Sequence, residues 1–224
     1  MNLLLFDIDG TLISTGGAAL RAADLAFENI YGVKNVMANI TADGKTDYLI
    51  LNEMFQNGLG RGYTAQESEV IFNEYLRILD KDLNNGGNIT VLPGVVDLLD
   101  RLVDKNDVVL GLATGNIERG AWTKLKHCGL DRYFSFGGFG SDAQQRETLV
   151  RAGIERGRRA ADRHLYNIYV IGDTPRDIIA GKAAGASTVG VSTGVYSYKQ
   201  LESHNPEYLF NDFSNIDSFL NILQ

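Results

Sequence analysis

The sequence predicts an α/β protein, a doubly wound parallel sheet with an all-helical segment inserted after the first strand. Three observations lead to this fold class. An apolar run at residues 3–6, bounded by polar residues, is typical of a short strand buried on both faces. Helical periodicity then fills residues 14–88. From residue 91 onward strand and helix patterns alternate, as in parallel sheets. We predict a core of residues 1–13 and 89–224 and a cap domain of residues 14–88.

The inserted segment has three amphipathic stretches, and helices are predicted at residues 17–31, 46–57 and 65–83. In the first, Leu20, Ala23, Phe27 and Ile30 share one face, which predicts a buried side. The third begins at a Thr-x-x-Glu pattern, Thr64 to Glu67, which predicts a capping box. The Asn- and Gly-rich cluster at residues 84–88 then breaks the helical pattern.

The remaining elements belong to the core. Short β-branched or apolar runs predict strands, and the periodic stretches between them predict helices. Strands are expected at residues 108–113, 133–139, 168–171, 187–191 and 208–210, and helices at 94–105, 118–128, 144–160, 175–185 and 214–223. Each strand of such a unit ends on the same edge of the sheet, where open α/β sheets bind their ligands.

The composition narrows the class of partner. A formal net charge of -7 disfavours nucleic acid and anionic membrane surfaces. No apolar run approaches the 18 residues of a membrane span, and the first apolar run is too short for a signal peptide. The single cysteine, Cys128, excludes an internal disulfide. We expect a cytoplasmic protein with no nucleic-acid and no membrane partner, and the oligomeric state stays open.

Two carboxylates, Asp7 and Asp9, follow the first strand directly. Gly10 permits the turn that leaves both beyond the carboxyl end of the strand. Two anions crowded at that edge repel one another unless a cation or a proton lies between them. The arrangement therefore predicts chemistry on a metal-bound anion, although aspartates also serve as simple caps.

Two later strands end in polar groups that can join this pair. The run Thr114-Gly115-Asn116 follows one strand at a helix start, where backbone N–H groups bind anions. Asp173 follows another, with Asp177 four residues further along the next helix. Mg²⁺ takes one or two carboxylates, keeps waters and bridges to phosphate. Together these strand ends predict a Mg²⁺-dependent phosphate site.

The run Asp7-Ile-Asp-Gly-Thr-Leu12 resembles motif I of the haloacid dehalogenase-like superfamily of phosphohydrolases, and the segment from Gly172 to Asp177 resembles its phosphoglycolate-phosphatase-like members. The resemblance implies a helical cap and an aspartyl-phosphate mechanism. Asp7 would be the nucleophile and Asp9 the general acid and base. It also implies that Asp7, Asp173, the backbone carbonyl of Asp9 and, through water, Asp177 hold the metal ion. Thr114, Gly115 and Asn116 would hold the phosphate oxygens.

The sequence departs from the family pattern in motif III, where the family usually has a lysine. No lysine occurs between Lys126 and Lys182. We favour Arg146 as the cation that acts there, with Lys182 as its competitor. In the cap, Thr41-Ala-Asp-Gly-Lys-Thr-Asp47 resembles a loop that faces the active site in related phosphatases and mutases, so Lys45 is a candidate substrate contact.

The expected function is a phosphatase that hydrolyses a small phosphorylated metabolite. A sugar phosphomutase of the same fold is the alternative within the enzyme class, since it uses the same two aspartates. A phospho-accepting module or a catalytically silent binding protein is the alternative outside it. The intact Asp9 argues against a stored phosphate, because it would hydrolyse the phosphorylated Asp7.

Overall fold

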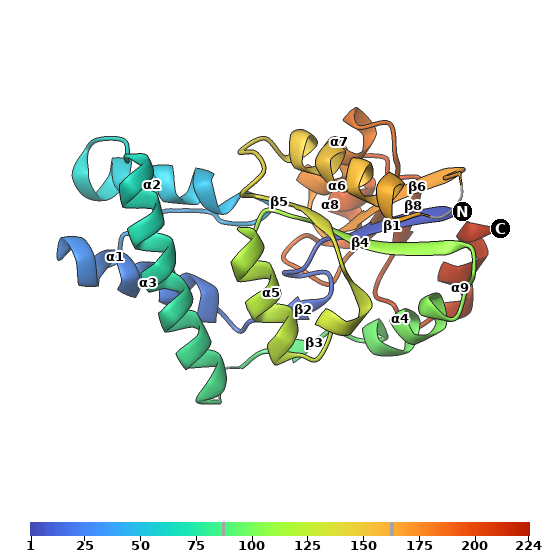
Figure 1. Ribbon diagram of the computed structural model, residues 1–224, viewed down its shortest axis with the longest axis horizontal. Helices are drawn as coiled ribbons and strands as arrows, with labels where there is room; N and C mark the ends of the chain where they lie inside the picture. Colours follow the sequence, from blue (N-terminus) through green and yellow to red (C-terminus); the bar gives the residue numbers. More distant parts are fainter. Residues whose placement is uncertain (87, 162–163) are drawn as a thin grey trace.

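The computed structural model describes residues 1–86, 88–161 and 164–224. Within them the central sheet has six parallel strands, in the order β5-β4-β1-β6-β7-β8. These are β5 (Gly137–Phe139), β4 (Val108–Thr114), β1 (Asn2–Phe6), β6 (Asn167–Gly172), β7 (Ser187–Val191) and β8 (Tyr208–Phe210). Because β1 lies between β4 and β6, the three strands with polar ends are neighbours at the middle of the sheet (Figure 1).

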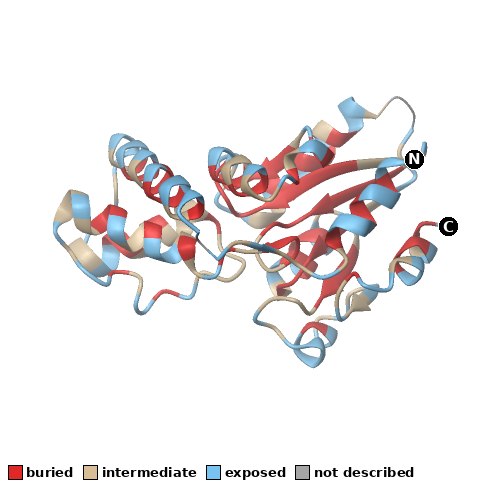
Figure 2. Ribbon diagram, turned by 90° about the horizontal axis from the view of Figure 1, so that it is seen from below, coloured by how far each residue is buried: buried red, intermediate tan, exposed pale blue. Residues whose placement is uncertain are grey.

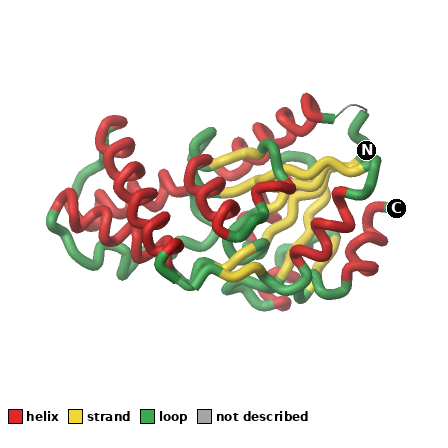
Figure 3. The backbone as a smooth tube through the Cα atoms, turned by 60° about the horizontal axis from the view of Figure 1, so that its bottom comes forward, coloured by secondary structure: helices red, strands yellow, loops and turns green. Residues whose placement is uncertain are grey.

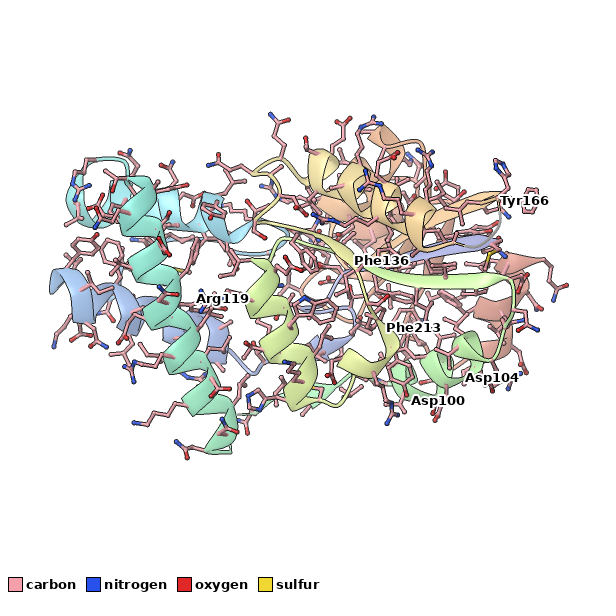
Figure 4. All side chains as sticks on the ribbon, viewed as in Figure 1. Asp100, Asp104, Arg119, Phe136, Tyr166 and Phe213 are labelled. Atoms are coloured by element: carbon pink, nitrogen blue, oxygen red, sulfur yellow. The ribbon has the colours of Figure 1, made fainter. Side chains whose placement is uncertain are left out.

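Helices cover both faces of the sheet. This is required because successive side chains of β1 point to opposite faces and all of them are buried. Leu4 and Phe6 belong to a hydrophobic cluster with α4 (Val95–Val103), α5 (Glu118–His127) and α9 (Ile216–Leu220). Leu3 and Leu5 point to the other face, under α6 (Arg146–Ala160) and α7 (Pro175–Ala183). Figure 2 shows the buried strands between these exposed helix surfaces, and Figure 3 shows helices on both sides of the sheet. The ring of Phe213, labelled in Figure 4, packs edge-on against Phe6.

The helical insert consists of α1 (Ala18–Tyr31), α2 (Asp47–Leu59) and α3 (Ala65–Asn84), which lie beside the sheet in Figure 1. They pack around a hydrophobic cluster of their own, with Phe27, Phe55 and Leu79 fully buried. One contact to the core runs from Arg119 of α5 to Asn73 of α3, at 2.7 Å (Figure 4). The division of the chain into core and cap domain stays a prediction that proteolysis can test.

The α/β fold class is confirmed, and the differences lie in short elements. The predicted strand at 133–139 is reduced to β5 after a 3₁₀ turn at Asp131–Tyr133, and the last helix is followed by a 3₁₀ turn at Asn221–Leu223. The sequence did not predict α8 (Tyr198–Glu202) or the antiparallel pair β2 (Ile13–Ser14) and β3 (Thr90–Val91). Gly87, part of the predicted break, lies outside the described residues. None of the helices in the described ranges has the length and apolar character needed to cross a membrane.

Candidate active site

Three acidic side chains meet at the carboxyl edge of the central strands. Asp7 follows β1, Asp173 follows β6, and Asp177 lies in the first turn of α7. One carboxylate oxygen from each lies within 4.8 Å of the others, and all three residues are buried. Burial raises the pKa of Asp7 to about 6, partly opposed by the charge of Arg146. Burial and the charges of Asp177 and Asp7 raise the pKa of Asp173 well above its usual value. The cluster is therefore arranged for a cation.

Two glycines make room for the Asp173 carboxylate. A Cβ atom on Gly10 would lie 2.3 Å from Asp173 Oδ2, and Gly10 also has a φ of +79°, which disfavours other residues. A Cβ atom on Gly194 would lie 1.7 Å from the same oxygen. The Thr11 hydroxyl donates to Asp173 Oδ1 at 3.1 Å and fixes its orientation.

Arg146 lies at the start of α6 and supplies the cation of the acidic cluster. Its side chain is 8% exposed, and Nη2 lies 2.7 Å from Asp7 Oδ2. Nε and Nη2 both donate to Asp177 Oδ1, at 2.9 and 2.5 Å, and Nη1 donates to the Gly44 carbonyl at 3.1 Å. Lys182, the other candidate for this cation, does not join the acidic cluster. Its Nζ donates to the backbone carbonyls of His204 and Asn205. Of the two candidate cations, the structure brings Arg146 to Asp7.

Asp177 contacts Arg146 and also caps the start of α7. Its Oδ2 accepts hydrogen bonds from the backbone N–H and the hydroxyl of Thr174, in a capping box. Because both of its oxygens already accept hydrogen bonds, Asp177 is suited to act on a metal ion through water. Asp7 and Asp173 are the better placed direct ligands.

Asp9 faces a separate set of partners. Its Oδ2 accepts from Asn116 Nδ2 at 2.8 Å and from Lys124 Nζ at 2.7 Å, while Lys124 also donates to Asn116 Oδ1 at 2.6 Å. The Lys124 side chain is 3% exposed and that of Asp9 is 39% exposed. Burial lowers the pKa of Lys124, but the charge and hydrogen bond of Asp9 together with the nearby Tyr75 and Asp47 outweigh it and hold that pKa above its usual value. The two aspartates of motif I therefore have different cations.

Lys124 was not among the residues that the sequence analysis singled out. A signal for it exists in α5, where Ala121 and Leu125 are fully buried and Lys124 lies on the same stripe of the helix. A lysine on a buried stripe needs an anion, because a buried charge without a partner is strongly unfavourable. The interpretation of α5 as an ordinary amphipathic helix missed this.

The end of β4 was predicted to hold phosphate oxygens. The hydroxyl oxygen of Thr114, which is fully buried, accepts from the backbone N–H of Asn116 at 3.3 Å and from its Nδ2 at 2.8 Å. The hydroxyl proton is then available to donate to a phosphate oxygen. The N–H groups of Ile117 and Glu118 are bonded to Asp47 and Ser141. Asn116 thus contacts Asp9 and Thr114, and phosphate contact at this strand end stays a prediction for Thr114, Gly115 and Asn116.

The loop before α2 packs directly on this strand end. Asp47 N donates to the Gly115 carbonyl at 2.8 Å, and Asp47 Oδ2 accepts from Ile117 N at 2.8 Å. A Cβ atom on Gly115 would lie 2.2 Å from the Lys45 carbonyl oxygen, so the approach requires glycine. The Lys45 ammonium, the candidate substrate contact, lies 2.6 and 2.7 Å from the two oxygens of Glu53.

A cavity of about 410 Å³ is lined by most of these groups, although Asp177 lies outside its lining. Its floor contains Asp7, Asp9, Thr114, Arg146 and Asp173. Its walls come from the helical insert and the loop at Gly44 and Lys45. Polar groups predicted from three distant segments of the sequence, at Asp7, Thr114 and Asp173, therefore line one partly open cavity.

Known proteins resemble this chain over almost its whole length. A profile of the haloacid dehalogenase-like hydrolases matches residues 4–191. The chain belongs to this family. It is 25% identical to the probable phosphatase IndB of Dickeya dadantii, over 96% of this chain and 91% of that one. It is 23% identical to the pyrophosphatase PpaX of Bacillus pumilus, over 96% and 94%. The crystal structure of a predicted phosphoglycolate phosphatase from Haemophilus somnus shares the fold, with a TM-score of 0.72, 21% identity and coverage of 99% and 97%.

Haloacid dehalogenase-like phosphatases use a divalent metal ion, and the residues of this chain fit one. The donor set of Asp7, Asp173 and Asp177 consists of hard carboxylate oxygens, which suit Mg²⁺. Three buried carboxylates share the single charge of Arg146, so the cluster has excess negative charge. A divalent ion at this edge of the sheet would offset it.

Proposed function

We propose that this protein is a Mg²⁺-dependent phosphomonoesterase that hydrolyses a small phosphorylated metabolite through a phosphorylated Asp7. The observation that carries the proposal is the separation of the two aspartates. Asp7 lies beside Arg146 in the acidic cluster, while Asp9 lies beside Lys124 and Asn116. Two carboxylates with different environments can take different roles, one as nucleophile and one as acid and base.

In the first step, the Asp7 carboxylate attacks the phosphorus atom. The bond to the leaving oxygen breaks with its electron pair, and that oxygen takes the proton of the Asp9 carboxyl group. The Thr114 hydroxyl donates to a non-bridging phosphate oxygen. Arg146 offsets the negative charge that accumulates between Asp7 and the phosphoryl group.

In the second step, Asp9 accepts a proton from water as the water oxygen attacks phosphorus. The bond between phosphorus and Asp7 breaks, which restores the Asp7 carboxylate and releases phosphate. Asp7, Asp173 and the Asp9 carbonyl would hold Mg²⁺ directly and Asp177 through water. The bound ion would offset charge on the phosphate oxygens. Lys124 and Asn116 keep the Asp9 carboxyl group in place through both steps. A location in the cytoplasm stays a prediction.

The test is phosphate release from acetyl phosphate and a panel of phosphate esters, with Mg²⁺ and with chelator. We expect Mg²⁺-dependent release by the wild type and none by Asp7→Asn. Asp9→Asn is expected to accumulate a phosphorylated protein from acetyl phosphate, because that leaving group needs little help from an acid. The mass of the intact protein measures this intermediate.

Asp104→Asn, an exposed position on the core labelled in Figure 4, is the matched control and should retain wild-type activity. Undiminished release by Asp7→Asn would refute the proposal. Transfer of phosphate between two hydroxyls of one sugar, without free phosphate, would instead assign the sugar phosphomutase. A stable phosphorylated wild type would indicate the phospho-accepting module.

A further inference from the structure

The part of the cavity above the phosphate-binding floor is built from apolar side chains of the helical insert. These come from α1, α2, α3 and the loop after α1, and include Leu20, Met37, Ile50, Met54, Phe72 and Tyr75. Leu20 is 46% exposed, whereas Phe27 on the same face of α1 is fully buried. An exposed leucine on the wall of this cavity is available to a ligand.

The cations on this cavity are already paired. Among the described residues that line it, Lys45 lies against Glu53, Lys124 against Asp9, and Arg146 against Asp7. The other charged side chains on the cavity are acidic, including Asp43 and Asp47. A second anionic group on the substrate would meet negative charge and, among the described residues that line the cavity, no unpaired cation.

The volume allows more than a phosphoryl group. At about 30 Å³ per water molecule, 410 Å³ corresponds to roughly 14 waters. A phosphate and an organic group of several carbon atoms fit this space, and the apolar walls provide the contact surface for that group.

We infer that the substrate is a phosphate monoester whose leaving group is uncharged and largely apolar, an alkyl or aromatic alcohol. This rests on the proposed phosphatase function and adds the substrate class. It also excludes, as substrates of this chain, compounds with a second anionic group, such as pyrophosphate or phosphoglycolate. The names of similar proteins mention these two compounds. The apolar helices hold the organic group over the acidic cluster while the phosphoryl group occupies the floor.

The test compares kcat/KM for ethyl, butyl and hexyl phosphate with that for phosphoglycolate and pyrophosphate. Each buried methylene should raise kcat/KM about two- to fourfold, which predicts an increase of at least about tenfold from ethyl to hexyl phosphate. The two doubly anionic substrates should be poorer than ethyl phosphate. No dependence on chain length, or a preference for either doubly anionic substrate, would overturn the inference.

A pair of substitutions on α1 tests the wall itself. Leu20→Lys places a cation on the cavity and should lower the ratio of hexyl to ethyl phosphate activity at least about threefold. Leu25→Lys is the matched control, because Leu25 is 44% exposed on the same helix but does not line the cavity. An unchanged ratio in Leu20→Lys would contradict the inference.

The two hypotheses fail in different ways. Mg²⁺-dependent hydrolysis of acetyl phosphate, lost in Asp7→Asn, together with no preference for alkyl groups refutes only the substrate class. Absence of hydrolysis with every substrate refutes the proposed function, and the substrate class with it.

Discussion

Replacing Arg146 tests whether one guanidinium balances the acidic cluster. Its side chain is 8% exposed, and Asp7 and Asp177, which it contacts, are similarly buried. Arg146→Met keeps most of the volume and removes the charge. Removal of one partner from a buried ionic group costs about 3–5 kcal/mol, because the remaining charges lose their compensation. We expect the free energy of unfolding at pH 7, without metal ion, to fall by that amount.

The loss should depend on pH in a defined direction. Burial raises the pKa of Asp7 to about 6, even though the charge of Arg146 lowers it. In the variant the pKa of Asp7 rises further, so its carboxylate takes up a proton at a higher pH than in the wild type. Once protonated, Asp7 no longer repels the other carboxylates of the cluster. The destabilisation is therefore expected to be smaller at pH 5 than at pH 7, and urea unfolding at both values measures it.

Activity should fall as well. Loss of one preorganised charge contact in a transition state typically lowers kcat about 10²–10³-fold. Arg146→Lys keeps the charge but not the planar fork that reaches Asp7, Asp177 and the Gly44 carbonyl together, and we expect an intermediate loss. Arg158→Met, at an exposed ion pair on the same helix, is the control and should change the stability by less than about 1 kcal/mol. Wild-type stability and kcat in Arg146→Met would refute this account.

Two further changes probe the other polar groups of the cavity. Lys124→Met should lower kcat about 10- to 100-fold because Asp9 loses its ammonium partner. Lys126→Met, at an exposed position of the same helix, is the control and should leave kcat unchanged. Equal kcat values for both variants in steady-state assays would exclude a role of Lys124 in supporting Asp9. Burial raises the pKa of Asp47 to about 6, so the stability it contributes is present at low pH and is lost as pH rises from about 4 to about 6. Asp47→Asn should therefore be more stable than the wild type by about 1–3 kcal/mol at pH 7, in urea unfolding without metal ion, and should lose this advantage near pH 4. A difference that does not vary with pH would contradict that explanation.

The parts of the fold that the sequence predicted are those with local causes. The strand before Asp7 and the helix that begins at Thr64 follow from an apolar run and a capping box, and both are present. The pair β2 and β3 joins residues 13–14 to residues 90–91, and two-residue strands have no periodicity to detect. The five-residue helix α8 is equally short. Long-range pairing and short elements depend on the tertiary structure and are not visible in a local pattern.

The candidate site divides in the same way. Asp7, Thr114 and Asp173 were predicted because each lies at the end of a strand or directly after it, and the parallel sheet brings such ends together. The role of Lys124 depends on how α5 packs over the strand ends, which the periodicity of that helix alone does not give. The face of α1 with Leu20 and Phe27 was predicted as one buried side, but Phe27 lies in the insert cluster and Leu20 lines the cavity. A hydrophobic stripe predicts burial without distinguishing a core from a binding site.

The use of an arginine where the family usually has a lysine has a consequence for the whole site. Arg146 contacts Asp7, the predicted nucleophile, and also donates to the carbonyl of Gly44, in the loop before α2. The ammonium group of a lysine is a single charged atom, so it cannot donate to Asp7 and to the Gly44 carbonyl from separate nitrogen atoms as the guanidinium group does. The same residue therefore joins the charge balance of Asp7 to the loop that closes the cavity. Asp47 in that loop also bonds to the strand end at Gly115. One set of contacts therefore holds both the loop that lines the cavity and the predicted catalytic groups.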